Sequence, residues 1–113
     1  MAKSFGSDNH SGIHPQILEA IVETNIGHSP SYGTDALTIE VNALFKEHFG
    51  DKAETFFVFN GTAANVLSIK THIKSYESVL CAQDSHLNLD ECGAPEAIAG
   101  SKLIPLPSPE GKI

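Results

Sequence analysis

Three short apolar runs, separated by helical patterns, constrain the fold of this chain more than any other feature. The runs are ETFFVF (54–59), SVLCA (78–82) and KLIPLP (102–107). The first run is apolar and aromatic without alternation, which is typical of a strand buried on both faces of a parallel sheet. Helical patterns at 62–74 and 94–100 separate the runs. Strands that alternate with helices predict an α/β layered sheet with right-handed crossovers.

Two amphipathic helices are predicted ahead of the first strand. In HPQILEAIVETN (14–25), the four apolar residues between Ile17 and Val22 share one helical face. In DALTIEVNALFKEHFG (35–50), Asp35 can cap the first turn and Gly50 can end the helix. A loop rich in Gly, Ser and Pro joins the two helices.

Composition excludes several classes of partner. The chain has 113 residues, which suits one small domain, and its formal net charge is −7. This acidic balance argues against nucleic acid and against an anionic membrane surface, because both require a basic face. No apolar segment is long enough to span a bilayer. Cys81 and Cys92 are too few for a disulfide scaffold and suggest a reducing compartment, so we expect a cytoplasmic protein.

The corner after the first run is a candidate binding site. Asn60, Gly61 and Thr62 lie between the predicted strand and the next helix. Ligands bind beyond the carboxyl ends of strands in open α/β sheets, and a helix N-terminus offers unpaired N–H groups. Gly61 allows close approach and Thr62 adds a hydroxyl donor, which together favour a cup for phosphate or carboxylate. The alternative is that Asn60 or Thr62 only caps the helix.

The loop after the second run carries a second set of candidates. Asp84, His86, Asp90 and Glu91 cluster there, at the same predicted sheet edge as the corner. His86 could stack on a flat heteroaromatic ring or transfer a proton. The alternative is a surface histidine in an acidic loop. No metal site is predicted, because the spacing is irregular and no cysteine pair has zinc spacing.

The chain as a whole resembles the opening of the threonine aldolases. The blocks that carry the resemblance are FGSDNHSGIHPQILEA, SYGTDALTIEVNALFKEHFG, FVFNGTAANVLSIK and DSHLNLDECGAPEAIAGSKLIPLP. That family consists of pyridoxal-phosphate enzymes of fold type I, the aspartate-aminotransferase fold. The resemblance implies an N-terminal arm with helices at 1–50. It implies that 51–113 is the beginning of the cofactor-binding α/β large domain, with only the first strands of its sheet.

The resemblance also implies roles for the two candidate clusters. Asn60, Gly61 and Thr62 match the family's Ser-Gly-Thr phosphate cup, with Asn in place of the commoner Ser. His86 matches the histidine that stacks on the pyridoxal ring and assists proton transfer. Glu91 falls in the family's DE-G-A block and is expected to support the site from behind.

Two further residues are matched to the substrate. Ser7 matches a serine near the substrate carboxylate, and Tyr32 matches a tyrosine that lines the active site, often that of the neighbouring subunit. The resemblance thus implies a homo-oligomer, a dimer or tetramer, of the complete chain. None of the seven lysines matches the Schiff-base lysine of the family. We therefore expect the chain to be the N-terminal part of a larger enzyme and to be inactive alone.

The reaction implied by the resemblance is the cleavage of threonine or allo-threonine to glycine and acetaldehyde, with pyridoxal 5'-phosphate as cofactor. Other interpretations stay open at this point. The corner could serve a non-catalytic module that binds a phosphorylated ligand. The Tyr32 loop could belong to an oligomer-forming piece. Within the same fold, a β-eliminating lyase or an aminotransferase is the nearest rival enzyme.

Overall fold

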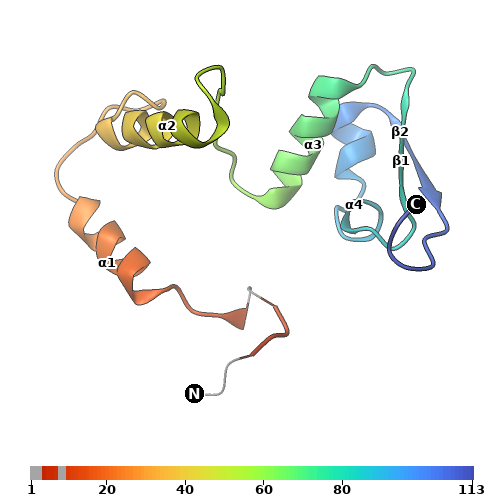
Figure 1. Cartoon of the computed structure of the whole chain (residues 1–113), viewed down its shortest axis with the longest axis horizontal. Helices are drawn as coiled ribbons and strands as arrows, with labels where there is room; N and C mark the ends of the chain where they lie inside the picture. The colour runs from red at the N-terminus through yellow and green to blue at the C-terminus, as the bar shows by residue number, and fades with distance from the viewer. Residues whose placement is uncertain (1–3, 8–9) are drawn as a thin grey trace. The chain divides into compact units, whose positions relative to one another are not determined.

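The computed structural model describes residues 4–7 and 10–113. Contacts divide the chain between Thr55 and Phe56 into two compact units. The first unit holds the helices α1 and α2, and the second holds the remaining elements, which Figure 1 shows from green to blue. The sequence-based boundary at residue 50 stays a prediction.

The first unit contains the two predicted helices. Helix α1 spans Pro15–Thr24, and the His14 ring Nδ1 accepts a hydrogen bond of 3.3 Å from the Gln16 N–H at its start. The apolar face that the sequence predicts for this helix is exposed, because none of the described residues covers it. The start of the helix is thus marked by local signals, the His14 cap and Pro15 in the first turn.

Helix α2 spans Ala36–Phe49 and begins and ends as the sequence predicts. The Asp35 carboxylate accepts a hydrogen bond of 2.9 Å from the Thr38 N–H, which satisfies one donor of the first turn. Gly50 ends the helix at a φ of 95°, a conformation that favours glycine.

The second unit is a small parallel α/β layer. Its elements are α3 (Gly61–His72), β1 (Ser78–Ala82), α4 (His86–Leu89), the short π-helix η2 (Pro95–Ala99) and β2 (Lys102–Leu106). Strands β1 and β2 pair in parallel, with Val79 opposite Leu103 and Leu80 opposite Ile104. The α4–η2 segment forms the crossover between them. The predicted α/β class is confirmed.

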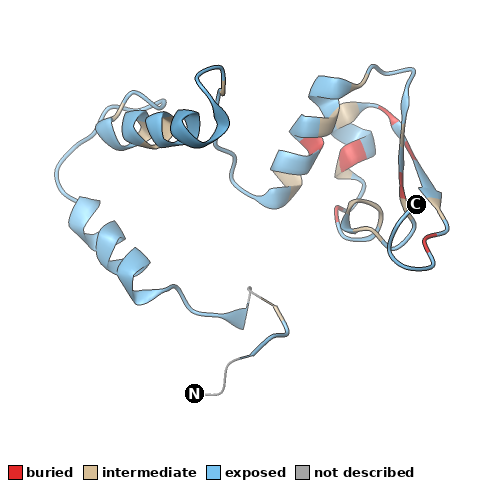
Figure 2. Cartoon of the chain, viewed as in Figure 1, coloured by how far each residue is buried: buried red, intermediate tan, exposed pale blue. Residues whose placement is uncertain are grey.

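The core lies in this second unit. Among the described residues, the buried apolar side chains are Val66 of α3, Cys81 of β1, Pro95 of η2 and Leu103 of β2, and Figure 2 shows the buried positions in red. Helix α3 is tied to η2 by a hydrogen bond of 2.8 Å from Lys70 Nζ to the Ile98 carbonyl. A period of two places Cys81 and Leu103 inward on their strands.

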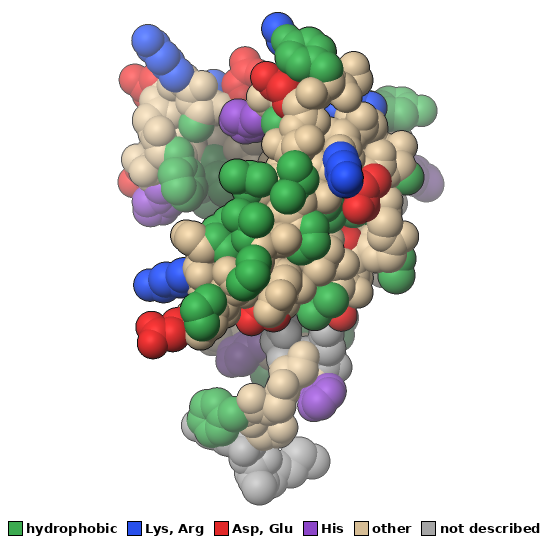
Figure 3. Space-filling view, turned by 90° about the vertical axis from the view of Figure 1, so that its right-hand side faces the viewer, with side chains coloured by type: hydrophobic (Ala, Val, Ile, Leu, Met, Phe, Trp, Pro, Cys, Tyr) green, Lys and Arg blue, Asp and Glu red, His purple; other side chains and the backbone are tan. Residues whose placement is uncertain are grey.

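The other face of the two-stranded sheet is uncovered. Leu80 and Ile104 face each other across the ladder and are both exposed. Figure 3 shows hydrophobic side chains gathered on one face of the molecule. The described residues therefore cover only one face of this sheet.

The prediction of a buried strand at 54–59 is wrong. This segment contains no strand, and Phe56 and Phe59 are 81% and 90% exposed. A strand exists only where a neighbour pairs its backbone N–H and C=O groups. Among the described residues only β1 and β2 pair, so 54–59 has no ladder to join.

The loop between the strands is more regular than predicted. The segment after β1, which the sequence predicts as a loop, contains the single-turn helix α4. The Asp90 N–H closes that turn on the His86 carbonyl at 2.9 Å.

Within the described residues no helix combines the length and apolarity that crossing a membrane requires.

Candidate functional site

The Asn60-Gly61-Thr62 corner lies at the N-terminus of α3. The Asn60 side-chain Oδ1 accepts a hydrogen bond of 2.8 Å from the Ala63 N–H, so Asn60 caps the helix, as the alternative interpretation allowed. The N–H groups of Gly61 and Thr62 have no hydrogen-bond partner among the described residues. These two donors point out of the positive end of the helix dipole and suit an anion.

Gly61 leaves space at this corner. A Cβ atom added to Gly61 would meet nothing within 4 Å. Its neighbour Thr62 is half-buried, and Asn60 is exposed. The space that a side chain at Gly61 would occupy is therefore open to a ligand.

His86 and Glu91 form a pair in the loop after β1. The His86 ring Nδ1 lies 2.8 Å from the Glu91 Oε1 atom. The carboxylate of Glu91 is fully buried, whereas the His86 side chain is 65% exposed. An exposed imidazole is thus held from behind by a buried acid.

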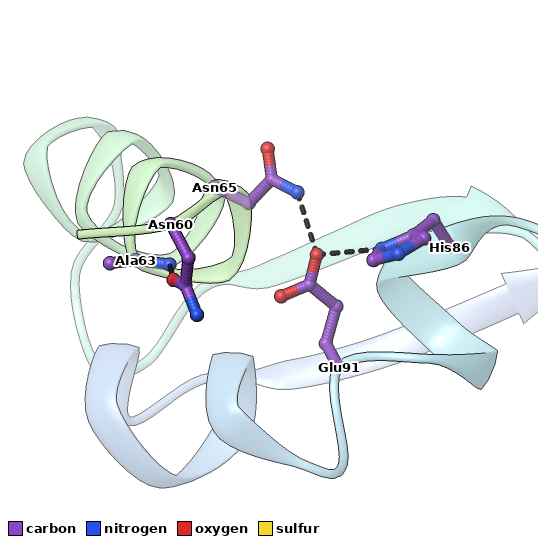
Figure 4. A network of polar contacts seen from close by, with 5 residues as sticks. All are labelled: Asn60, Ala63, Asn65, His86 and Glu91. Carbon is purple, nitrogen blue, oxygen red and sulfur yellow. Dashed lines mark hydrogen bonds and ion pairs between the residues drawn. The ribbon is translucent and has the colours of Figure 1, made fainter. Parts of the chain in front are cut away.

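Asn65 connects this pair to helix α3. Its side-chain Nδ2 donates a hydrogen bond of 2.6 Å to the same Glu91 Oε1 atom, across 26 residues of chain. Figure 4 shows Glu91 between Asn65 and His86, with the capped turn at Asn60 on the same helix. These contacts join the His86 loop to helix α3 at Asn65, about one turn after the corner.

The network keeps Glu91 ionised. The hydrogen bond from Asn65 does most to lower the pKa of Glu91, and the His86 and Thr62 side chains lower it further. Burial of the carboxylate opposes this effect and raises the pKa. The net result is a pKa below the ordinary range of a glutamate.

We expect the network to be acid-sensitive. A carboxyl whose folded pKa lies below its unfolded value stabilises the folded state fully above the unfolded pKa, about 4.3 for glutamate. This contribution is lost as the pH falls through the lower, folded pKa. Thermal unfolding of the natural full-length protein between about pH 3 and 7 should show this as a loss of stability that Glu91→Gln lacks.

The matched control for this titration is Glu96→Gln, an exposed glutamate on η2. The Glu96→Gln protein should follow the natural protein at every pH. If the curves of thermal stability against pH were parallel for the natural protein and Glu91→Gln, they would contradict a lowered pKa of Glu91.

Ser7 and Tyr32 belong to the first unit. The Ser7 carbonyl accepts a hydrogen bond of 3.2 Å from the His10 N–H, and residues 8 and 9 of the GSDN motif lie outside the described residues. Tyr32 is fully exposed at a φ of 66°, followed by Gly33 at 78°. A tyrosine in this left-handed region is strained, and such strain is concentrated at functional sites.

Two polar contacts were not foreseen from the sequence. Asn65 lies one helical turn after Gly61, so the period of α3 could have placed it on the same face as the corner. The Ser108 hydroxyl donates a hydrogen bond to the Asp84 carboxylate, which joins the segments beyond the carboxyl ends of β1 and β2. Nothing local to either residue indicates that pairing.

Three further features of the described residues bear on function. Among residues 4–7 and 10–113, no group of three His, Cys, Asp or Glu side chains could hold a metal ion. Cys81 and Cys92 are free thiols. A groove of about 520 Å³ runs along α3, but its lining carries no titratable group: Phe56, Val58, Ala64, Leu67, Ser68 and Thr71.

The chain is similar to known threonine aldolases. The chain is 44% identical over 112 residues to a low specificity L-threonine aldolase of Pseudomonas aeruginosa, and 43% identical over 113 residues to one of another Pseudomonas species. These matches cover 98% and 99% of this chain. The chain spans about a third of the length of these relatives, 32% and 33%.

A solved structure and a family profile complete the comparison. The threonine aldolase of Leishmania major superposes with a TM-score of 0.82 at 30% identity, over 91% of this chain and 30% of that one. The sequence profile of the beta-eliminating lyase family matches residues 4–113. This chain therefore belongs to the beta-eliminating lyase family.

Proposed function

We propose that the natural full-length protein is a pyridoxal-phosphate-dependent aldolase that cleaves threonine or allo-threonine to glycine and acetaldehyde. The similarity to low specificity L-threonine aldolases supports this reaction. The observation that carries the proposal is the network in which Glu91 bonds to both Asn65 of α3 and the exposed His86. It ties the loop that carries His86 to the helix whose N-terminus would bind the phosphate, within one compact unit.

The corner fits the phosphate group of this cofactor. Gly61 and Thr62 offer two unpaired N–H groups at a helix N-terminus, the arrangement that binds phosphate in many proteins. The Thr62 hydroxyl would add a third donor, whereas Asn60 already uses its Oδ1 as a cap. When bound, pyridoxal phosphate supplies an electron sink for cleavage of the bond next to the substrate amine.

The other residues act on the ring and the substrate. His86 would stack on the cofactor ring and take the proton of the substrate hydroxyl, and Glu91 would hold His86 in place. Ser7 would contact the substrate carboxylate. Tyr32 would line the site, and its strained, exposed position suits a contact with a neighbouring subunit in a homo-oligomer. The dimer or tetramer state and the cytoplasmic location stay predictions.

A β-elimination reaction is the second candidate, because the family profile that matches the chain is that of the beta-eliminating lyases. The two reactions release different products from different substrates. Cleavage of threonine gives acetaldehyde and glycine, whereas elimination from serine gives pyruvate and ammonia.

The test is an assay of the natural full-length protein with and without added cofactor. We expect acetaldehyde and glycine from L-threonine and L-allo-threonine, only when the cofactor is present. If serine gives pyruvate faster than threonine gives acetaldehyde, the protein catalyses β-elimination and is not an aldolase. No product from any of these substrates would reject both.

The 113 residues by themselves are proposed to be inactive. None of their lysines matches the family's cofactor-binding lysine, and correct positioning can supply about 7–11 kcal/mol of barrier lowering. Mixed with pyridoxal phosphate and dialysed, this stretch should stay colourless and release no more acetaldehyde than the free cofactor. A dialysis-resistant yellow complex with turnover would show that a lysine of this stretch binds the cofactor.

A further inference from the structure

The Glu91 carboxylate is bonded unevenly. Its Oε1 atom accepts both hydrogen bonds, from Asn65 at 2.6 Å and from His86 at 2.8 Å. Its Oε2 atom is buried and has no hydrogen-bond partner among the described residues. The two hydrogen bonds that hold the carboxylate, one from helix α3 and one from the loop after β1, therefore converge on a single oxygen atom.

The backbone around Glu91 is also strained. Cys92, the next residue, has a φ of 51°, and Gly93 follows at 74°. A cysteine in the left-handed region is uncommon and persists only where its surroundings hold it. This turn follows Glu91 directly, so the acid lies at the start of a constrained bend.

An ionised carboxylate can only accept hydrogen bonds. The His86 nitrogen that bonds to it, Nδ1, must therefore carry the proton, and in the neutral ring Nε2 is then an unprotonated acceptor. We infer that Glu91, anchored to α3 by Asn65, is a positioning residue that fixes His86 in its Nδ1–H tautomer and leaves Nε2 as the free proton acceptor.

Its catalytic consequence rests on the proposed aldolase function. The substrate hydroxyl would give its proton to Nε2, and the resulting imidazolium would bear a positive charge beside the Glu91 carboxylate. The proton returns to product or solvent from the same nitrogen, so the ring ends neutral. Asn65 holds the Glu91 carboxylate against α3. Because the carboxylate holds the His86 ring, Asn65 also fixes the position of that ring relative to the corner.

The first measurement needs no variant and no activity. Nitrogen-15 spectra of the natural full-length protein, recorded near about pH 9 where imidazole side chains are neutral, report which ring nitrogen carries the proton. The His86 ring is assigned by its loss in His86→Phe. We expect a protonated Nδ1 and an unprotonated Nε2. A ring that carries its proton on Nε2 would overturn the inference.

Variants test the cause of the tautomer. Glu91→Leu keeps a side chain of similar volume and removes the acceptor, so the His86 signals should move to those of a mixture of tautomers. Glu96→Leu, an exposed site on η2, is the matched control and should leave them unchanged. Unchanged His86 signals in folded Glu91→Leu would show that another group fixes the ring.

Turnover provides an independent readout. In the Ser-His-Asp triad, loss of the acid that fixes the histidine tautomer lowers kcat by about 10⁴-fold, so kcat of Glu91→Leu should fall by at least about 10-fold with little change in KM. If the natural protein has no aldolase activity but shows the Nδ1–H ring, the proposed function fails and the positioning role stands. An active aldolase with an Nε2–H ring would support the proposed function and overturn the positioning role.

Discussion

Replacing His86 by Phe in the natural full-length protein should lower turnover of threonine by about 10²-fold or more while the cofactor stays bound. Phe retains a flat ring of similar size that can stack, but it has no nitrogen to accept a proton. Because His86 is 65% exposed, the substitution removes little packing. The measurement is kcat for acetaldehyde release, together with the cofactor absorbance that survives dialysis.

The matched control for this substitution is His72→Phe. His72 lies in the last turn of α3, where its ring bonds only to neighbours within four residues of the same helix. Its loss should leave kcat within about twofold, as is usual for an exposed side chain outside the site. Full activity in His86→Phe would show that His86 does not accept the substrate proton and that its ring serves only for packing.

The local patterns of the sequence were sufficient for most of the fold. Helix α2 begins and ends at Asp35 and Gly50 because both signals act within one turn. The segment at 54–59 could not be judged in this way. Its apolar composition predicts a strand, but a strand depends on a partner elsewhere in the chain, and local composition carries no information on that partner.

The candidate site stays a prediction. The rule that ligands bind beyond the carboxyl ends of strands pointed to the corner and to His86, but only the His86 loop follows a strand in the structure, β1. Asn65 was missed because its contact with Glu91 spans 26 residues and depends on how α3 lies against the loop. The positive φ of Tyr32 was also not predicted, because the left-handed conformation is expected at glycine and not at tyrosine.

Replacing Thr62 by Val should weaken cofactor binding by about 1–3 kcal/mol, roughly 5- to 150-fold in Kd. Valine has nearly the same shape as threonine, so the change removes the hydroxyl donor and keeps the packing of a half-buried position. A donor to a phosphate that loses its water shell belongs to the stronger class of hydrogen bonds. The measurement is Kd for pyridoxal phosphate by titration of its absorbance.

Two other variants separate the possible causes of that loss. Thr62→Ser restores the hydroxyl and should recover most of the affinity. Thr71→Val makes the same change in the last turn of the same helix, where the hydroxyl bonds only within that turn, and should leave Kd unchanged.

The remaining question is whether Thr62 serves the cofactor or Glu91, because its side chain also helps to lower the pKa of that carboxyl. If its only role were to support Glu91, Thr62→Val would disturb the His86 ring signals and leave Kd for the cofactor unchanged. That outcome would remove Thr62 from the phosphate cup. A weakened Kd with unchanged His86 signals would assign the hydroxyl to the phosphate, because Asn65 and His86 alone would then suffice to hold the acid.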